Sequence, residues 1–194
     1  MPANSSYLYP VGFPVAGPSS PDGWVLLNKQ TFSGVNVVYF NNLNPRAVHK
    51  MYINMFLQVV NTSNGVSVTF NNDAASNYQW TNTYQDVNSS NSFSSSSDTK
   101  MVISSTSGVG PCANSAFTSE LIWSTPSMLG NNGIQLTSIL YRSQENRNPG
   151  GAQAIMINGC GTYIGEKGTG SVQVVSSSTT GTQVGTIWLW ELAP

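Results

Sequence analysis

The chain has 194 residues, a length suited to one β-sandwich domain with a core of its own, and 39% of them are hydrophobic. Only 8% are charged, about a third of the share usual in soluble domains, and the net charge is −1. Seven scattered lysines and arginines cannot supply the phosphate contacts of a nucleic-acid-binding protein or the charge of a membrane-surface protein, and no apolar run is long enough for a transmembrane helix.

Residues 1–23 combine frequent proline and glycine with aromatic side chains. Proline prevents regular structure, whereas disordered tails are usually poor in aromatic residues. We therefore predict an extended N-terminal arm that becomes ordered by docking on a partner, although a spacer folded back on its own domain would have the same composition. The predicted anchors of the arm are Tyr7, Leu8, Tyr9, Val11, Phe13 and Val15.

The first residues lack the basic and apolar regions of a secretory signal, so we expect synthesis in a cytoplasm. Cys112 and Cys160 are then expected to be reduced and to serve as small buried hydrophobic residues.

From Trp24 onward the pattern predicts strands and turns, beginning with an apolar stretch at 34–40. Strict alternation over 46–60 predicts a strand with one face in a core. The Asn64-Gly65 step ends a turn that leads to the apolar stretch 66–70. Because this dipeptide favours tight turns between antiparallel strands, the two strands are predicted to form a hairpin.

Residues 71–98 are mostly polar and predict a long loop region. Its Ser89–Ser97 tract is of low complexity, so this part is predicted to be mobile. The loop also contains Tyr78, Trp80 and Tyr84, which we predict to face a ligand such as a sugar ring.

Further strands are predicted at 100–104, 117–123, 134–141, 154–157, 162–164, 171–175 and 183–192. The last one is apolar on both faces, because Ile187 and Leu189 alternate with Trp188 and Trp190. A sandwich strand normally has one wet face, so the second face indicates either a contact with another subunit or a locally thick core.

No segment has a sustained helical period, and about eight to ten strands fit an all-β fold. We predict a two-sheet antiparallel β-sandwich, or jelly roll, over residues 24–194, preceded by the arm at 1–23. The neutral surface of Ser, Asn, Thr and Gln suits a protein held in a fixed assembly, since freely diffusing proteins usually carry more charge.

A series of strand-edge motifs runs along residues 23–192. They are Gly23-Trp24-Val25-Leu26-Leu27, Phe40-Asn41-Asn42-Leu43-Asn44, His49-Lys50-Met51-Tyr52-Ile53-Asn54-Met55, Val68-Thr69-Phe70-Asn71-Asn72-Asp73, Asn77-Tyr78, Thr118-Ser119-Glu120-Leu121-Ile122 with Pro126, and Gly185-Thr186-Ile187-Trp188-Leu189-Trp190. The series resembles small jelly-roll virion proteins of tailed bacteriophages. Such proteins occur as head decoration (cement) proteins and as tail or fibre modules.

The resemblance implies a homotrimer around a threefold axis, a location in the virion, and no catalytic residues. Its partners would be copies of the chain and the major capsid protein or other virion proteins. One departure is that Trp190-Glu191 stands where the family's final strand usually closes on a Tyr-Gly step. This departure leaves open whether the protein belongs to the head or to the tail.

Candidate catalytic and metal-binding groups are few. His49 is the single histidine and is expected at a surface or strand edge, and no Gly-x-Ser-x-Gly nucleophile motif is present. One histidine and two distant cysteines do not make a zinc site. Asp73 and Asp86 flank the aromatic loop, so a glycosidase pair is conceivable, and Asn71-Asn72-Asp73 could bind calcium or simply cap a turn.

We therefore expect no catalytic, cofactor-binding or metal-binding residues, and no enzyme activity. The favoured hypothesis is a trimeric capsid decoration protein anchored by its arm, because the chain has little beyond one domain and an arm. The alternative is a tail or fibre module that binds a host receptor or surface carbohydrate. A free-standing carbohydrate-binding or hydrolytic domain is disfavoured by the missing signal sequence and the scarcity of catalytic groups.

Overall fold

A computed structural model of the chain describes residues 22–58, 65–86, 89–104, 115–125, 135–147, 153–165, 168–176 and 182–192. These residues form twelve strands and contain no helix. The strands are β1 (Trp24–Ser33), β2 (Val37–Phe40), β3 (Val48–Gln58), β4 (Val66–Phe70), β5 (Tyr78–Gln85), β6 (Ser90–Asp98), β7 (Met101–Val102), β8 (Ser115–Ser124), β9 (Gln135–Arg147), β10 (Gln153–Gly165), β11 (Val172–Ser176) and β12 (Thr182–Leu192). The prediction of an all-β, two-sheet antiparallel sandwich is confirmed, while the jelly-roll order of the strands stays a prediction.

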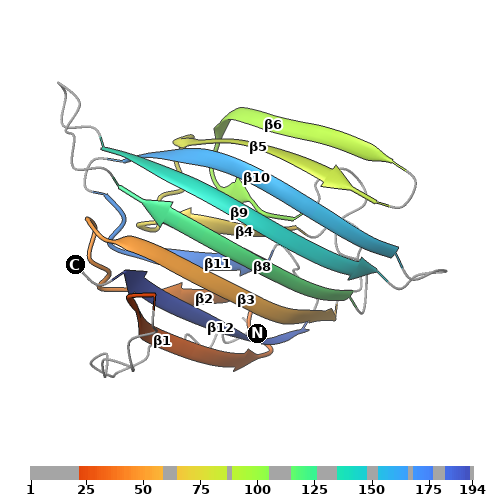
Figure 1. Cartoon of the computed structure of the whole chain (residues 1–194), viewed down its shortest axis with the longest axis horizontal. Helices are drawn as coiled ribbons and strands as arrows, with labels where there is room; N and C mark the ends of the chain where they lie inside the picture. Colours follow the sequence, from red (N-terminus) through yellow and green to blue (C-terminus); the bar gives the residue numbers. More distant parts are fainter. Residues whose placement is uncertain are drawn as a thin grey trace, which may run out of the picture.

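The larger sheet has eight strands in the order β1-β12-β3-β8-β9-β10-β5-β6, and the smaller has four in the order β2-β11-β4-β7. Every pairing is antiparallel. Figure 1 shows β2, β11 and β4 lying behind the larger sheet. β1 begins at Trp24, where the sequence places the start of the domain, and residues 1–21 of the predicted arm lie outside the described residues.

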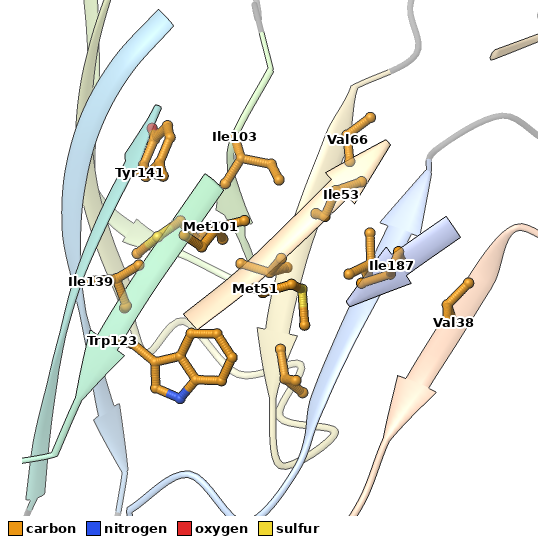
Figure 2. Packing of buried hydrophobic residues seen from close by; sticks show 14 of the residues in the cluster. Val38, Met51, Ile53, Val66, Met101, Ile103, Trp123, Ile139, Tyr141 and Ile187 are labelled. Carbon is orange, nitrogen blue, oxygen red and sulfur yellow. The ribbon is translucent and has the colours of Figure 1, made fainter. Parts of the chain in front are cut away.

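The core lies between the two sheets and follows from strict alternation along the strands. In β5 buried and exposed residues alternate without a break, and in β3 Met51, Ile53 and Met55 are buried while the residues between them are exposed. Figure 2 shows how side chains of the larger sheet meet those of the smaller one. Those labelled include Ile53, Trp123, Ile139 and Ile187 of the larger sheet with Val38, Val66 and Met101 of the smaller.

The predicted hairpin between 46–60 and 66–70 is wrong. β3 pairs with β12 and β8 in the larger sheet, whereas β4 pairs with β11 and β7 in the smaller sheet. The chain therefore changes sheets between Gln58 and Val66. An Asn-Gly step favours a turn, but it does not decide which strand pairs with which.

The predicted polar loop at 71–98 is also wrong, because most of it forms the hairpin of β5 and β6 at one edge of the larger sheet. The serine-rich tract is strand β6. Its Phe93 stacks on Tyr84 with ring centroids 5.5 Å apart, and the Asn91 amide donates a hydrogen bond to Tyr84 Oη. These contacts hold a strand whose serines have weak strand propensity of their own.

The two short strands predicted at 154–157 and 162–164 form a single strand, β10, which runs through Gly159 and Gly161. A Cβ at Gly159 would lie 2.2 Å from Tyr141 Cζ, so the glycine gives the tyrosine ring room to cross the strand. Tyr141 Oη then donates a hydrogen bond to the Val102 carbonyl, which joins the larger sheet to β7.

Candidate assembly and binding surface

We call the face of the eight-stranded sheet that points away from the core the outer face. Its side chains alternate along each strand with the buried ones. Every exposed large hydrophobic side chain among the described residues lies on this face. They are Tyr52, Phe56, Ile122, Leu136, Leu140, Met156, Val184 and Leu192. Isolated exposed hydrophobic residues are normal on a protein surface, but their restriction to one face marks that face for contact.

Three of the five tryptophans also lie on the outer face, at its β1–β12 side. We call Trp24, Trp188 and Trp190 the tryptophan edge; all three are half-buried. Lys50 Nζ lies 4.8 Å from the Trp24 ring centroid and 5.5 Å from that of Trp190. Lys29 Nζ lies 5.5 Å from the Trp188 ring. Each such cation–π contact contributes about 0.5–1 kcal/mol at an exposed site, so the rings are held in place without being covered.

The register of the strands places outer-face residues in cross-strand rows. One row brings together Trp190, Lys50, Ile122, Leu140 and Cys160, and it is largely apolar. The next row contains Lys29, Trp188, Tyr52, Glu120, Arg142 and Asn158. Charged side chains are therefore confined to a few positions of the face, so burying the face against a partner requires the desolvation of few charges.

A hollow of about 180 Å³ opens on the outer face between β3, β8, β9 and β10. Its lining residues are Tyr52, Thr118, Ser119, Glu120, Arg142, Ser143, Gln144 and Met156. No sequence motif points to this hollow. The signal that could have found it is alternation: Tyr52 alternates with the core residues of β3, and Arg142 and Gln144 with those of β9.

The predicted final-strand residues divide between the two faces. Ile187 and Leu189 are fully buried in the core, and Trp188 and Trp190 lie on the outer face. The second apolar face predicted for this strand is therefore real, and among the described residues it has no layer of the sandwich over it.

The predicted ligand-facing loop is wrong, because Tyr78, Trp80 and Tyr84 lie on β5 with their side chains in the core. Tyr78 is fully buried, and its hydroxyl accepts a hydrogen bond from the Phe70 amide. Burial raises the pKa of Tyr78. Trp80 Nε1 donates to Asp98 Oδ2. The predicted arm anchors from Tyr7 to Val15 lie outside the described residues.

His49 is fully buried, so its predicted place at a surface or edge is wrong. Its ring stacks on Trp123, with centroids 5.2 Å apart. Its Nε2 lies 3.3 Å from Glu191 Oε2, but without the geometry of a hydrogen bond. Burial lowers the pKa of His49 to about 4, and burial raises the pKa of Glu191. The neutral ring thus serves packing in this arrangement.

Asp73 is held as part of a turn. Its carboxylate accepts hydrogen bonds from the Ala75 amide, the Asn77 side chain and Tyr163 Oη. Burial would raise the pKa of Asp73, but these hydrogen bonds outweigh it and hold the pKa below its ordinary value. Turn capping therefore accounts for Asp73, whereas Asn71 Oδ1 accepts hydrogen bonds from the Gly170 and Ser171 amides and so joins its turn to the segment that precedes β11.

Cys160 is exposed on the outer face next to Leu140, so its predicted burial is wrong, and Cys112 lies outside the described residues. Within the described ranges no group of three or more His, Cys, Asp and Glu residues is arranged to hold a metal ion. Across the same residues there is no helix of a length and hydrophobicity that would cross a membrane.

Neither a protein-family model nor a curated protein sequence matches the chain.

Proposed function

We propose that the chain is a non-enzymatic virion structural protein that assembles as a homotrimer and decorates a bacteriophage head. The observation that carries the proposal is the outer face, which gathers every exposed large hydrophobic side chain of the described residues on a sandwich whose core is already filled. A face with this composition is stabilised by covering it. The resemblance to phage virion proteins supplies the kind of assembly.

The size of the outer face supports a subunit contact. Eight strands spaced about 4.8 Å apart, each about ten residues long at about 3.3 Å per residue, give a face on the order of 1,000 Å². A stable protein interface buries about 800 Å² on each partner. Part of the face is therefore enough for a lasting contact.

The tryptophan edge is the part that we assign to the trimer contact. Tryptophan is enriched where interfaces are strongest, because a single ring buries a large apolar area at little cost in side-chain entropy. Lys29 and Lys50 already contact these rings. At the rim of the subunit contact their ammonium groups are placed to donate hydrogen bonds to neutral groups of the neighbouring subunit. A threefold contact at this edge leaves the β8–β10 side of the outer face open.

The experiment is a light-scattering measurement of molar mass on the purified full-length protein at micromolar concentration. We expect three copies, and a double variant Trp188→Ser/Trp190→Ser should shift the protein toward a monomer. Leu140→Ser, on the same face but three strands from β12, is the matched control and should stay trimeric. A monomeric wild-type protein would contradict the proposed trimer, and antibody labelling of tails instead of heads would contradict the proposed decoration role.

The alternative role as a tail or fibre module that binds a receptor was based on Tyr78, Trp80 and Tyr84. Because these side chains lie in the core, that basis is gone. A ligand-binding role now depends on the hollow of the outer face instead.

A further inference from the structure

We propose that the hollow on the outer face, between β3, β8, β9 and β10, is a binding site for a neutral saccharide. This inference does not require the trimer, because the hollow lies beside the tryptophan edge and shares no lining residue with it. It holds for a protein of the head or of the tail.

Two opposite charges beside the hollow are unpaired. Glu120 on β8 and Arg142 on β9 are cross-strand neighbours, and both line the hollow. Opposite charges directly across an antiparallel strand pair stabilise it when they pair. Here the two side chains form no ion pair and no hydrogen bond with any described residue. Both therefore keep their hydrogen-bonding capacity for a ligand between them.

The charge pattern selects the ligand. A carboxylate only accepts hydrogen bonds and a guanidinium only donates them, so the ligand must offer donors and acceptors side by side. A net anion would be attracted by Arg142 but repelled by the neighbouring Glu120, and a net cation the reverse, so the pair favours neither. Neighbouring hydroxyl groups on a neutral ring satisfy both side chains at once, since each hydroxyl can donate and accept.

The remaining lining fits the same class. Gln144 and Thr118 add an amide and a hydroxyl, which hydrogen-bond neutral hydroxyl groups. Tyr52 and Met156 are exposed and offer apolar surface to the carbon-bound hydrogens of a sugar ring. The Tyr52 ring is fixed from the other side by Trp188, with centroids 5.7 Å apart.

The size of the hollow sets the length of ligand it takes. At about 180 Å³ it is smaller than the roughly 300–1,000 Å³ pockets that enclose drug-sized ligands. It therefore suits a single sugar ring. Further rings of an oligosaccharide would extend over the flat polar part of the outer face, where Asn158, Thr83 and Ser92 continue the same cross-strand row. With so few contacts, we expect a dissociation constant of about millimolar for one ring.

The test is a titration of the ¹⁵N-labelled full-length protein, followed by NMR, with maltose, cellobiose, lactose and N,N′-diacetylchitobiose as neutral probes. Glucuronic acid and glucosamine serve as the anionic and cationic probes. At least one neutral probe should shift the amide signals of residues 118–120 and 142–144. Neither charged probe should do so at the same concentration.

Three variants locate the site. Glu120→Gln keeps the shape of the side chain and removes its charge, whereas Arg142→Gln shortens the side chain and replaces the guanidinium by a neutral amide; each should weaken binding about tenfold. Arg46→Gln, which removes an exposed arginine outside the sheet, is the matched control and should bind like wild type. Thermal unfolding of each variant confirms that the fold is kept. The proposal is overturned if no neutral probe shifts these signals at 20-fold the expected millimolar constant (about 20 mM), if a charged probe binds better, or if the two site variants bind like wild type.

Discussion

His49 packs as a neutral ring in a closed space between Trp123 and the Glu191 carboxylate. Because its pKa in the folded protein is about 4, below the ordinary value of 6.5, the unfolded chain binds a proton that the folded chain does not between these two pH values. The contribution of neutral His49 to the free energy of unfolding is therefore complete above pH 6.5 and decreases as the pH falls toward 4. The loss is at most on the order of 3 kcal/mol.

Urea unfolding of wild type and His49→Phe at pH 7.5, 6 and 5 measures this effect. The phenylalanine keeps the stack on Trp123 and removes the titrating group, so its unfolding free energy should change less with pH in this range. The Glu191 carboxyl has a raised pKa and contributes a slope of opposite sign near its own titration, which Glu191→Gln isolates. Equal pH slopes for wild type and His49→Phe would show that His49 is not the titrating group.

Gly159 is a second residue whose role depends on close approach. A methyl group there would meet the Tyr141 ring at 2.2 Å, and the ring is held by its hydrogen bond to the Val102 carbonyl. Gly159→Ala should therefore lower the unfolding free energy by about 1–3 kcal/mol, the usual cost of overpacking. Gly170→Ala is the control, because its methyl group would find ordinary contact at 3.7 Å. Chemical denaturation measures both, and equal costs would contradict the argument.

At the scale of elements, sequence patterns predicted strands well and partners poorly. The final strand and the strand at 46–60 were found because alternation is a local property of the chain. The partners of β3 are β8 and β12, which lie far along the chain, and no local pattern encodes this pairing. β6 was missed because serine has weak strand propensity and its place depends on Tyr84 of the neighbouring strand.

The same limit applies to the candidate site. Aromatic residues in a polar stretch indicated a ligand-facing loop, yet pairing with β10 turns Tyr78, Trp80 and Tyr84 into the core. Glu120 and Arg142 are unremarkable in the sequence, and they become neighbours only through the register of β8 and β9. Residue type indicated what chemistry was available, and pairing decided which groups meet.

For β6 we predict that one side chain decides whether the strand stays paired. Phe93→Ala removes the stack on Tyr84, a contact that contributes about 0.5–1.5 kcal/mol beyond the area it buries. Amide hydrogen exchange along 90–97 should then accelerate several-fold, while exchange in β3 and β12 stays unchanged. Ser94→Ala, at an exposed position of the same strand, is the control. Unchanged exchange in Phe93→Ala would mean that backbone pairing with β5 alone holds the strand.

At the scale of the whole molecule, the proposed functions are divided between the arm and the domain. A chain that starts at Asp22 keeps every described strand, so we expect it to fold and to form trimers through the tryptophan edge. It should fail to bind heads from which the protein has been removed, because the apolar residues of the arm are the proposed anchor. Each large side chain buried on the head would contribute roughly 1.5–3 kcal/mol.

A full-length variant with Tyr7→Ser, Tyr9→Ser and Phe13→Ser separates the loss of anchors from the loss of chain length. It should bind heads as poorly as the truncated chain. Since the arm carries a single charged side chain, Asp22, attachment of the full-length protein should withstand moderate salt, because there are few ion pairs to screen. Co-sedimentation with stripped heads at low and moderate salt measures both effects. Tight binding by the truncated chain, or release of the intact protein by moderate salt, would mean that the outer face, and not the arm, attaches the protein to the head.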